Sequence, residues 1–247
     1  MQFGLLGRKL SHSYSPQIHS FFGDYKYELF EKEPQELENF FKNKEFKGIN
    51  VTIPYKKDVI KYCDELSDVA KQLGSVNTIV NKNGRLLGYN TDYFGFSYMI
   101  KKAEIEVENK KAIVLGSGGA SVTCQAVLKN LGAKDVVVIS RNGENNYNNL
   151  YKHFDAQIIV NSTPVGMYPN VNDSIIDLAD FKNCEGVLDL IYNPNKTVLL
   201  KQAQSLGIKF SNGLSMLIAQ AKQSVEKFFD KKIDDKIIKK AEKEFKL

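Results

Sequence analysis

The chain has 247 residues, 43% of them hydrophobic, which allows two domains of ordinary size, each with its own buried core. Its net charge of +5 is modest and its lysines are interspersed with acids, so nucleic-acid binding is not expected, and no run of about 18 apolar residues predicts a membrane span or an export signal. The cysteines, Cys63, Cys124 and Cys184, show no CxxC spacing, so we expect core thiols in a cytoplasmic protein without a metal site.

Apolar runs alternate with helical patterns through the first hundred residues. The predicted strands are FGLLG (3–7), YKYEL (25–29), GINVT (48–52), SVNTIV (75–80) and RLLGY (85–89). Helices are predicted from Pro16, near 34–43, at 66–74 and from about Thr91. The pair Asn83-Gly84, between the last two strands, is typical of a hairpin turn. This alternation of strands and helices predicts an α/β domain.

The chain from residue 111 has the pattern of a doubly wound domain. KAIVLG (111–116), a helix to about Leu131 and DVVVIS (135–140) form one βαβ unit, and AQIIVNST (156–163) and GVLDLIY (186–192) supply further buried strands. After GIKFSNG (207–213) a helix containing LSMLIAQAKQSVEKFF begins, and the charge pattern of the tail (227–247) predicts a solvated amphipathic helix face.

Three glycines, Gly116, Gly118 and Gly119, lie between a predicted strand and a predicted helix. In that context backbone N–H groups approach a pyrophosphate, and the helix N-terminus offsets its negative charge. Ser121 occupies the third position of the usual dinucleotide-binding pattern, but Gly119 and Ala120 keep the start of the helix small. The pattern predicts a dinucleotide site, with a plain tight turn as the alternative.

The residues at the end of the next predicted strand, DVVVIS (135–140), indicate which dinucleotide binds. An acidic side chain at this position would bind a ribose 2′-hydroxyl, but the chain has Ser140, Arg141 and Asn142 there. Because an acid repels a 2′-phosphate and an arginine attracts it, we favour NADP over NAD. In the alternative interpretation, Arg141 is an ordinary surface side chain or stacks on the adenine.

The segment LSHSYSP (10–16) combines two serines with the start of a helix. Pro16 suits the first helical position and Ser15 the N-cap, so Ser13 and Ser15 are expected beside the positive end of a helix. That arrangement is suited to holding a carboxylate. Alternatively, Ser15 only caps its own helix.

A lysine and an aspartate follow predicted strands of the same region. NVTIPYK (50–56) places Thr52 and Lys56 at the end of a strand and in the turn after it, and GYNTDYFGF (88–96) places Asp92 in the first turn of a helix. Sites of α/β proteins gather at strand ends and helix starts. A lone lysine is usually a surface residue, so the case for Lys56 depends on these neighbours.

At this point the chain resembles the shikimate dehydrogenase family, almost from end to end. The matching motifs, in family order, are HSYSP, NVTIPYK, GSVNT, NTD, GSGGAS, NSTPVGM, DLIYNP and NGLSMLIAQA. Any one of these motifs has little specificity, but eight in the same order are a strong signal.

The resemblance implies a role for individual residues. The substrate carboxylate would bind Ser13 and Ser15, and Lys56 would be the catalytic amine, with Asp92 as the second catalytic residue. The substrate hydroxyls would contact Thr52, Asn77, Asp92, Tyr192 and Gln220. The nucleotide would lie against the glycine turn and the ends of later strands, at Gly116, Ser117, Gly118, Gly119, Ala120, Ser140, Arg141, Thr163, Leu190 and Gly213.

The resemblance also implies a fold and a reaction. A substrate-binding α/β domain with a mixed, mainly parallel sheet is expected at 1–101 plus 213–247, and a Rossmann-type doubly wound NADP-binding domain at 102–212, so that the C-terminal helices return to the first domain. The expected reaction is the reversible reduction of 3-dehydroshikimate to shikimate with NADPH, in the biosynthesis of chorismate and aromatic amino acids, by a monomer or homodimer. The Lys56 ammonium would donate a proton to the C3 oxygen.

Two segments depart from the family pattern. GRKL (7–10) stands in place of a proline-containing loop, and SRN (140–142) with Asn145 replaces NRT and a further basic residue. The second departure weakens the predicted contact with a 2′-phosphate. One alternative is therefore an NAD-dependent dehydrogenase of quinate and shikimate, although the presence of both Ser13 and Ser15 favours shikimate. A nucleotide-binding sensor without catalysis is the alternative from another class, and the joint presence of the lysine, the aspartate and the two serines argues against it.

Overall fold

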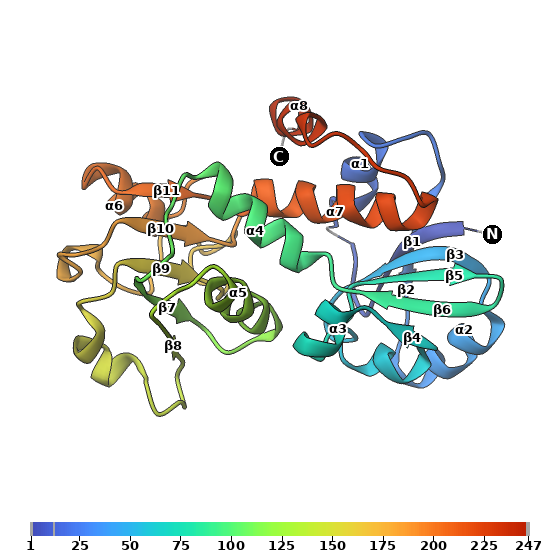
Figure 1. The fold of residues 1–247 in the computed structure, drawn as a ribbon, viewed down its shortest axis with the longest axis horizontal. Coiled ribbons are helices and arrows are strands. Elements are labelled where there is room, and N and C mark those ends of the chain that lie inside the picture. Colours follow the sequence, from blue (N-terminus) through green and yellow to red (C-terminus); the bar gives the residue numbers. More distant parts are fainter. Residues whose placement is uncertain (1, 12, 246–247) are drawn as a thin grey trace. The chain divides into compact units, whose positions relative to one another are not determined.

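The computed structural model describes residues 2–11 and 13–245. They form two compact units (Figure 1). Among the described residues, the first unit comprises those up to Asp92 together with residues 218–245, and the second unit consists of Tyr93–Leu217. Each unit has a sheet of its own.

The chain passes between the units inside two helices, α4 (Asp92–Lys102) and α7 (Leu214–Phe229). The sequence analysis placed the boundaries near the end of α4 and just before α7. The division falls inside α4 because its side chains Phe96 and Met99 are fully buried in a core cluster of the second unit.

A six-stranded mixed sheet forms the centre of the first unit, in the order β2-β1-β3-β5-β6-β4. β1 pairs in parallel with β2 and β3, and β4 pairs in parallel with β6, whereas β5 is antiparallel to both β3 and β6. The expected mixed, mainly parallel sheet is thus confirmed. Its strands are β1 (Gln2–Gly7), β2 (Tyr27–Glu31), β3 (Phe46–Val51), β4 (Glu65–Leu66), β5 (Thr78–Lys82) and β6 (Arg85–Tyr89).

The hairpin between β5 and β6 has the predicted turn. Asn83 has a φ of 54° and Gly84 a φ of 85°, and a two-residue turn of this kind requires a positive φ at both positions. The hairpin matters for the site because it reverses the chain, so that the end of β6 returns to the edge of the sheet where β5 begins.

Short helices and an aromatic and aliphatic core complete the first unit. The core joins Leu6, Ile49, Ile79 and Leu86, all fully buried, to apolar residues of three helical segments, among them Leu37, Val59 and Ala70. The helical segments of this unit are α1 (Ser15–Ser20), the 3-10 turns η1 (Pro34–Glu36) and η2 (Asp58–Tyr62), α2 (Leu37–Asn43), α3 (Asp68–Leu73) and α8 (Lys236–Glu244), and α2, η2 and α3 supply the core residues. The C-terminal helical segment belongs to the first unit, as expected.

The predicted amphipathic tail is divided between two helices. α7 ends at Phe229, and the next residue, Asp230, has a φ of 49°, which does not continue a helix. α8 then buries Ile238 and Ala241 while its lysines face solvent. No helix of the described residues is long and apolar enough to cross a bilayer.

The second unit is a five-stranded sheet in which every neighbouring pair is parallel. Its order is β11-β10-β9-β7-β8, so the direction of winding reverses between β7 and β9, as in doubly wound folds. The strands and helical segments are β7 (Lys111–Leu115), α5 (Gly119–Asn130), β8 (Asp135–Ile139), η3 (Tyr147–His153), β9 (Ile158–Asn161), η4 (Leu178–Asp180), β10 (Gly186–Asp189), α6 (Val198–Ser205) and β11 (Lys209–Ser211).

Both faces of this sheet are covered. Ala112 and Val114 of β7 pack in one buried cluster with α4 and α5, whereas Ile113 and Leu115 pack in the other with α6. Strands buried on both faces read as continuous apolar runs, which is why the sequence predicted them. Cys124 is buried in the cluster that includes α4 and α5. Cys184, partly buried, packs against the cluster that includes α6, and Cys63, also partly buried, packs against the core of the first unit.

Candidate active site

Sheet topology brings the polar candidates of the first unit to one edge. β3 ends at Val51, directly before Thr52, and the antiparallel β5 begins at Thr78, directly after Asn77. β6 runs back beside β5 and delivers the chain to Asp92. The end of a strand and the beginning of its antiparallel neighbour lie at the same edge of a sheet, so three distant segments supply side chains to one place.

Lys56 and Asp92 form an ion pair at this edge. The Lys56 Nζ lies 2.6 Å from Asp92 Oδ2, and 27% of the lysine side chain and 15% of the aspartate side chain are exposed. The backbone of Lys56 is fixed as well, since its carbonyl oxygen accepts a hydrogen bond from the Val76 N–H at 2.8 Å. The ammonium is therefore positioned by a carboxylate while remaining partly accessible.

Asn77 orients the carboxylate of this pair. Its Nδ2 donates to Asp92 Oδ1 at 2.9 Å and to Thr91 Oγ1 at 3.0 Å, and its Oδ1 accepts from the Thr91 N–H at 2.7 Å. Asp92 is also the first residue of α4, where the helix dipole favours a negative charge. The structure thus brings Lys56, Asn77 and Asp92 together.

A buried polar cluster that the sequence analysis did not identify supports this arrangement. Asn50 Nδ2 donates to Ser224 Oγ at 2.8 Å and to Thr78 Oγ1 at 3.0 Å, and Ser224 Oγ lies 3.0 Å from Thr91 Oγ1. All four residues are buried. The available signal was polar residues inside otherwise apolar strands, at Asn50 in β3 and Thr78 in β5, since a buried polar group requires a partner.

Helix α7 brings Gln220 to the same cluster. Thr91 Oγ1 donates to Gln220 Oε1 at 3.5 Å, and the Ser224 hydroxyl, one turn later, donates to the Gln220 carbonyl at 3.0 Å. Tyr192, by contrast, lies in the second unit, in the segment after β10.

The two serines lie at the start of α1, but their expected roles in the helix cap need correction. α1 begins at Ser15 itself, and the residue at the cap is Tyr14, which makes no side-chain cap hydrogen bond. Instead, Ser13 Oγ accepts from the Ser15 N–H at 3.2 Å and donates to Ser15 Oγ at 3.1 Å. Ser13 therefore accepts from the N–H of the first helical residue, and the two hydroxyls lie side by side.

The end of β1 contacts Thr52. The Thr52 N–H donates to the Leu6 carbonyl at 2.9 Å, and a Cβ at Gly7 would come within 2.7 Å of Thr52 Cγ2. A surface pocket of about 640 Å³ lies here, and its lining combines two cations with the segment before Lys56: Arg8, Lys9, Thr52, Ile53 and Pro54.

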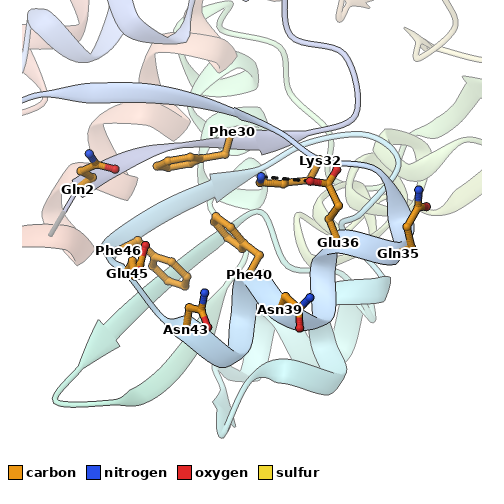
Figure 2. Close-up of a pocket in the computed structure, with 10 residues that line it drawn as sticks. All are labelled: Gln2, Phe30, Lys32, Gln35, Glu36, Asn39, Phe40, Asn43, Glu45 and Phe46. Atoms are coloured by element: carbon orange, nitrogen blue, oxygen red, sulfur yellow. Dashed lines mark hydrogen bonds and ion pairs between the residues drawn. The ribbon is translucent and has the colours of Figure 1, made fainter.

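A second pocket of the first unit, of about 560 Å³, is formed by other residues (Figure 2). Phe30, Phe40 and Phe46 line it, and Lys32 pairs there with Glu36 at 3.4 Å. None of the predicted site residues contributes to its lining. Because the lysine of the lining is already paired with a glutamate, we assign no chemistry to this pocket.

The glycine turn of the second unit lies where the direction of winding reverses. Gly116 follows β7 with a φ of 100°, and a Cβ there would come within 2.8 Å of Thr163 Cγ2, beyond the end of β9. A Cβ at Gly118 or Gly119 would lie more than 4 Å from every described neighbour. Ligands of doubly wound folds bind at this reversal, so the open start of α5 fits a dinucleotide pyrophosphate.

The other predicted nucleotide positions lie at the same edge of this sheet. Ser140 and Arg141 follow β8, and the Arg141 side chain is exposed to solvent. Leu190 follows β10, and Gly213 lies so close to it that a Cβ at Gly213 would be 2.0 Å from the Leu190 carbonyl oxygen. Only glycine fits at that position.

Comparisons with known proteins identify the family of this chain. The shikimate dehydrogenase substrate binding domain matches residues 5–79. A shikimate dehydrogenase (NADP(+)) of Clostridium beijerinckii is 38% identical, and the match covers 95% of this chain and 94% of that protein. The crystal structure of shikimate dehydrogenase 1 from Peptoclostridium difficile has a TM-score of 0.88 at 39% identity, covering 99% of this chain and 97% of that chain. The shikimate 5-dehydrogenase of Thermus thermophilus, solved in complex with NADP(H) and shikimate, has a TM-score of 0.88 at 29% identity, covering 99% of both chains.

Proposed function

Because the chain belongs to the shikimate dehydrogenase family, we propose that it catalyses the reversible reduction of 3-dehydroshikimate to shikimate with NADPH, a step of the cytoplasmic biosynthesis of chorismate and aromatic amino acids. The observation that carries the proposal is the Lys56–Asp92 ion pair, at a sheet edge inside a unit that matches the family's substrate binding domain. The first unit is the substrate-binding unit in this proposal, and the second binds the coenzyme.

The substrate contacts follow from the groups at that edge. Ser13 and Ser15 present adjacent hydroxyls to the carboxylate of the substrate. The proposed contacts of the ring hydroxyls are four polar side chains of the first unit and a tyrosine: Thr52, Asn77, Asp92, Gln220 and Tyr192. Neutral hydroxyls and amides bind neutral hydroxyls well, and the paired aspartate accepts a hydrogen bond more strongly than a neutral group would.

Lys56 is the proton donor in this proposal. NADPH, when bound, supplies the hydride that adds to the C3 carbonyl carbon. The carbonyl oxygen then gains negative charge, and the Lys56 ammonium stabilises that charge and transfers a proton to it. Asp92 keeps the lysine oriented, with Oδ1 held by Asn77 and Oδ2 facing Nζ. In the direction of shikimate oxidation, the neutral amine takes the proton back.

The coenzyme contacts lie at the reversal of the second sheet. The backbone from Gly116 to Ala120 surrounds the pyrophosphate, and Ser140 and Arg141 contact the adenosine ribose with its 2′-phosphate. Thr163, Leu190 and Gly213 complete the site. The exposed guanidinium of Arg141 is available for the phosphate, which supports NADP over NAD.

Initial rates at 340 nm test the function and separate it from its rivals. The wild-type chain is assayed with shikimate and with quinate, each with NADP+ and with NAD+. The proposal expects the highest kcat/KM for shikimate with NADP+. Comparable rates with quinate and NAD+ would identify the broader dehydrogenase, and tight coenzyme binding without turnover would identify a nucleotide-binding sensor.

A further inference from the structure

Asp189 is a buried carboxylate beside the proposed coenzyme site. It is the last residue of β10 and is 0% exposed. Three donors surround it: Asn161 Nδ2 at 3.0 Å and the Ile191 N–H at 3.1 Å, both to Oδ1, and Thr197 Oγ1 at 2.7 Å to Oδ2. Burial raises the pKa of this carboxyl to about 6, and the three hydrogen bonds limit the rise, so the group is ionised at neutral pH.

An ionised carboxylate only accepts hydrogen bonds, and this fixes the orientation of Asn161. The amide must turn its NH₂ group toward Asp189, which leaves its oxygen on the opposite side. That oxygen accepts from the Thr163 N–H at 3.0 Å and from Thr163 Oγ1 at 2.7 Å. The acceptor oxygen of Asp189 therefore helps to determine, through one amide, where the backbone and hydroxyl of Thr163 lie.

Thr163 in turn contacts the glycine turn. Its Cγ2 lies so near Gly116 that a Cβ there would come within 2.8 Å of it. Asp189 also holds the segment after β10, because it bonds the Ile191 N–H while the Ile191 carbonyl accepts from the Gly213 N–H at 3.0 Å. One carboxylate thus joins the ends of β9 and β10 to the turn after β7.

We propose that Asp189 is a positioning residue for the coenzyme, which acts by orienting Asn161 and, through it, Thr163 against the glycine turn. The inference rests on the proposed function, because it assumes that the coenzyme binds at this edge of the second unit. It predicts that loss of the acceptor at the Oδ1 position weakens coenzyme binding and leaves the apparent affinity for shikimate unchanged.

The variants Asp189→Leu, Asp189→Asn and Thr197→Val separate positioning from a purely structural role. Asp189→Leu removes both acceptors, so Asn161 Nδ2 keeps only the longer bond to the Val165 carbonyl, at 3.3 Å, and its orientation is less firmly held. Asp189→Asn retains an acceptor at the Oδ1 position. Thr197→Val removes only the partner of Oδ2, and because Thr197 also caps α6 through the Leu200 N–H, its loss affects stability.

NADP+ binding to the full chain is measured by isothermal titration calorimetry, together with thermal melting and the KM for shikimate. Asp189→Leu is expected to weaken NADP+ binding about tenfold, which corresponds to about 1.4 kcal/mol. Asp189→Asn should bind within about twofold of the wild type by the same scale. Thr197→Val should lower Tm without changing the Kd, and the KM for shikimate should stay constant throughout.

Equal NADP+ affinity in folded Asp189→Leu and wild type would overturn the proposal, as would an equal loss in Thr197→Val. If Asp189→Leu does not fold, Asn161→Ala provides the same comparison. If neither variant folds, the hydrogen bonds around Asp189 serve the fold alone, and the proposal is overturned as well. Turnover of shikimate by the wild type is assayed separately. Its absence, with the Asp189→Leu effect on NADP+ intact, would overturn the function but not the positioning role.

Discussion

The Lys56 ammonium lies 2.6 Å from the Asp92 carboxylate although 36 residues separate the two in the chain. Three strands and a hairpin bring them together, and Asn77 holds the carboxylate in place. The pair provides a proton donor with a fixed direction, which is what reduction of a carbonyl requires.

Replacement of Lys56 by Ala should abolish most of the activity. Loss of a general acid typically costs about 10²–10⁴-fold in rate, so we expect kcat to fall by that range with little change in the KM for shikimate. The measurement is steady-state kinetics in both directions. Lys57→Ala is the matched control, because Lys57 is the next residue and is exposed. An unchanged kcat in Lys56→Ala would remove this side chain from the mechanism.

The sequence predicted most elements of both units, for identifiable reasons. Strands of the second sheet are buried on both faces and so appear as continuous apolar runs, and the Asn83-Gly84 pair has few conformations other than the hairpin turn. It missed the eight-residue helix α6 (Val198–Ser205) and the two-residue strand β4 (Glu65–Leu66). Elements this short depend on tertiary contacts more than on local pattern.

The candidate site was only partly predictable. Strand ends and helix starts indicated Lys56 and Asp92 from position alone, and the structure brings them into contact. Asn50 and Ser224 were not identified, because their hydrogen bond joins residues 174 positions apart and no local pattern reports such a partner. The cap of α1 was assigned one residue too late because Pro16 is compatible with either of the first two helical positions.

Asp92→Asn should affect binding and turnover together. The amide would keep a contact with Asn77 only by turning its oxygen that way, and its NH₂ would then face the Lys56 ammonium, so the lysine would lose its anchor. We expect a higher KM for shikimate and a lower kcat, measured in the same assay. Asp68→Asn is the control, since Asp68 also begins a helix but has a fully exposed side chain. A variant with wild-type kcat and KM would contradict the anchoring role.

Asn50→Leu should destabilise the first unit. The change removes hydrogen bonds from Tyr27 Oη at 2.8 Å and to Ser224 Oγ and Thr78 Oγ1, so the part-buried tyrosine hydroxyl loses its acceptor and the two buried hydroxyls each lose a donor. A buried unsatisfied polar group costs about 1–3 kcal/mol, so we expect a loss of at least that size in the free energy of unfolding by urea. Asn39→Leu, at an exposed position of α2, serves as the control. Equal stability of the two variants would show that the cluster contributes little to folding.

His19 should make the chain sensitive to acid. It is 2% exposed, stacks on Tyr27 at 3.9 Å and bonds Tyr25 Oη through Nδ1 at 2.6 Å, and burial lowers its pKa from 6.5 to about 3. Below pH 6.5 the unfolded chain therefore binds a proton at His19, whereas the folded chain binds it only as the pH approaches 3. The stability is fully present above pH 6.5 and falls as the pH drops toward 3, by up to about 1.4 kcal/mol per pH unit.

The variant His19→Phe isolates this contribution. It retains a ring for stacking but cannot bind a proton, and it loses the bond to Tyr25, so it should be less stable than the wild type at neutral pH. As the pH falls below 6.5 toward 3, the difference should narrow, because only the wild type is destabilised by protonation of the unfolded chain. Urea unfolding at several pH values provides the comparison. A constant difference over this range would mean that His19 titrates alike in the folded and unfolded chain.

Phe245→Ala should weaken shikimate binding from the far end of the sequence. Phe245, directly after α8, is 6% exposed, and its ring meets that of Tyr14, between the two predicted carboxylate-binding serines, at 5.6 Å and 81°. α8 is itself fixed by the buried Lys222, which pairs with Glu226 at 3.0 Å and with Asp235 at 2.7 Å. An aromatic pair of this kind contributes about 0.5–1.5 kcal/mol, so the KM for shikimate should rise about two- to tenfold while the KM for NADP+ stays constant.

Phe229→Ala is the matched control, because its ring contacts Phe3 and Tyr25 and is 39% exposed. If both variants raise the KM equally, the effect comes from general loosening of the first unit rather than from the support that Phe245 gives to the serine segment.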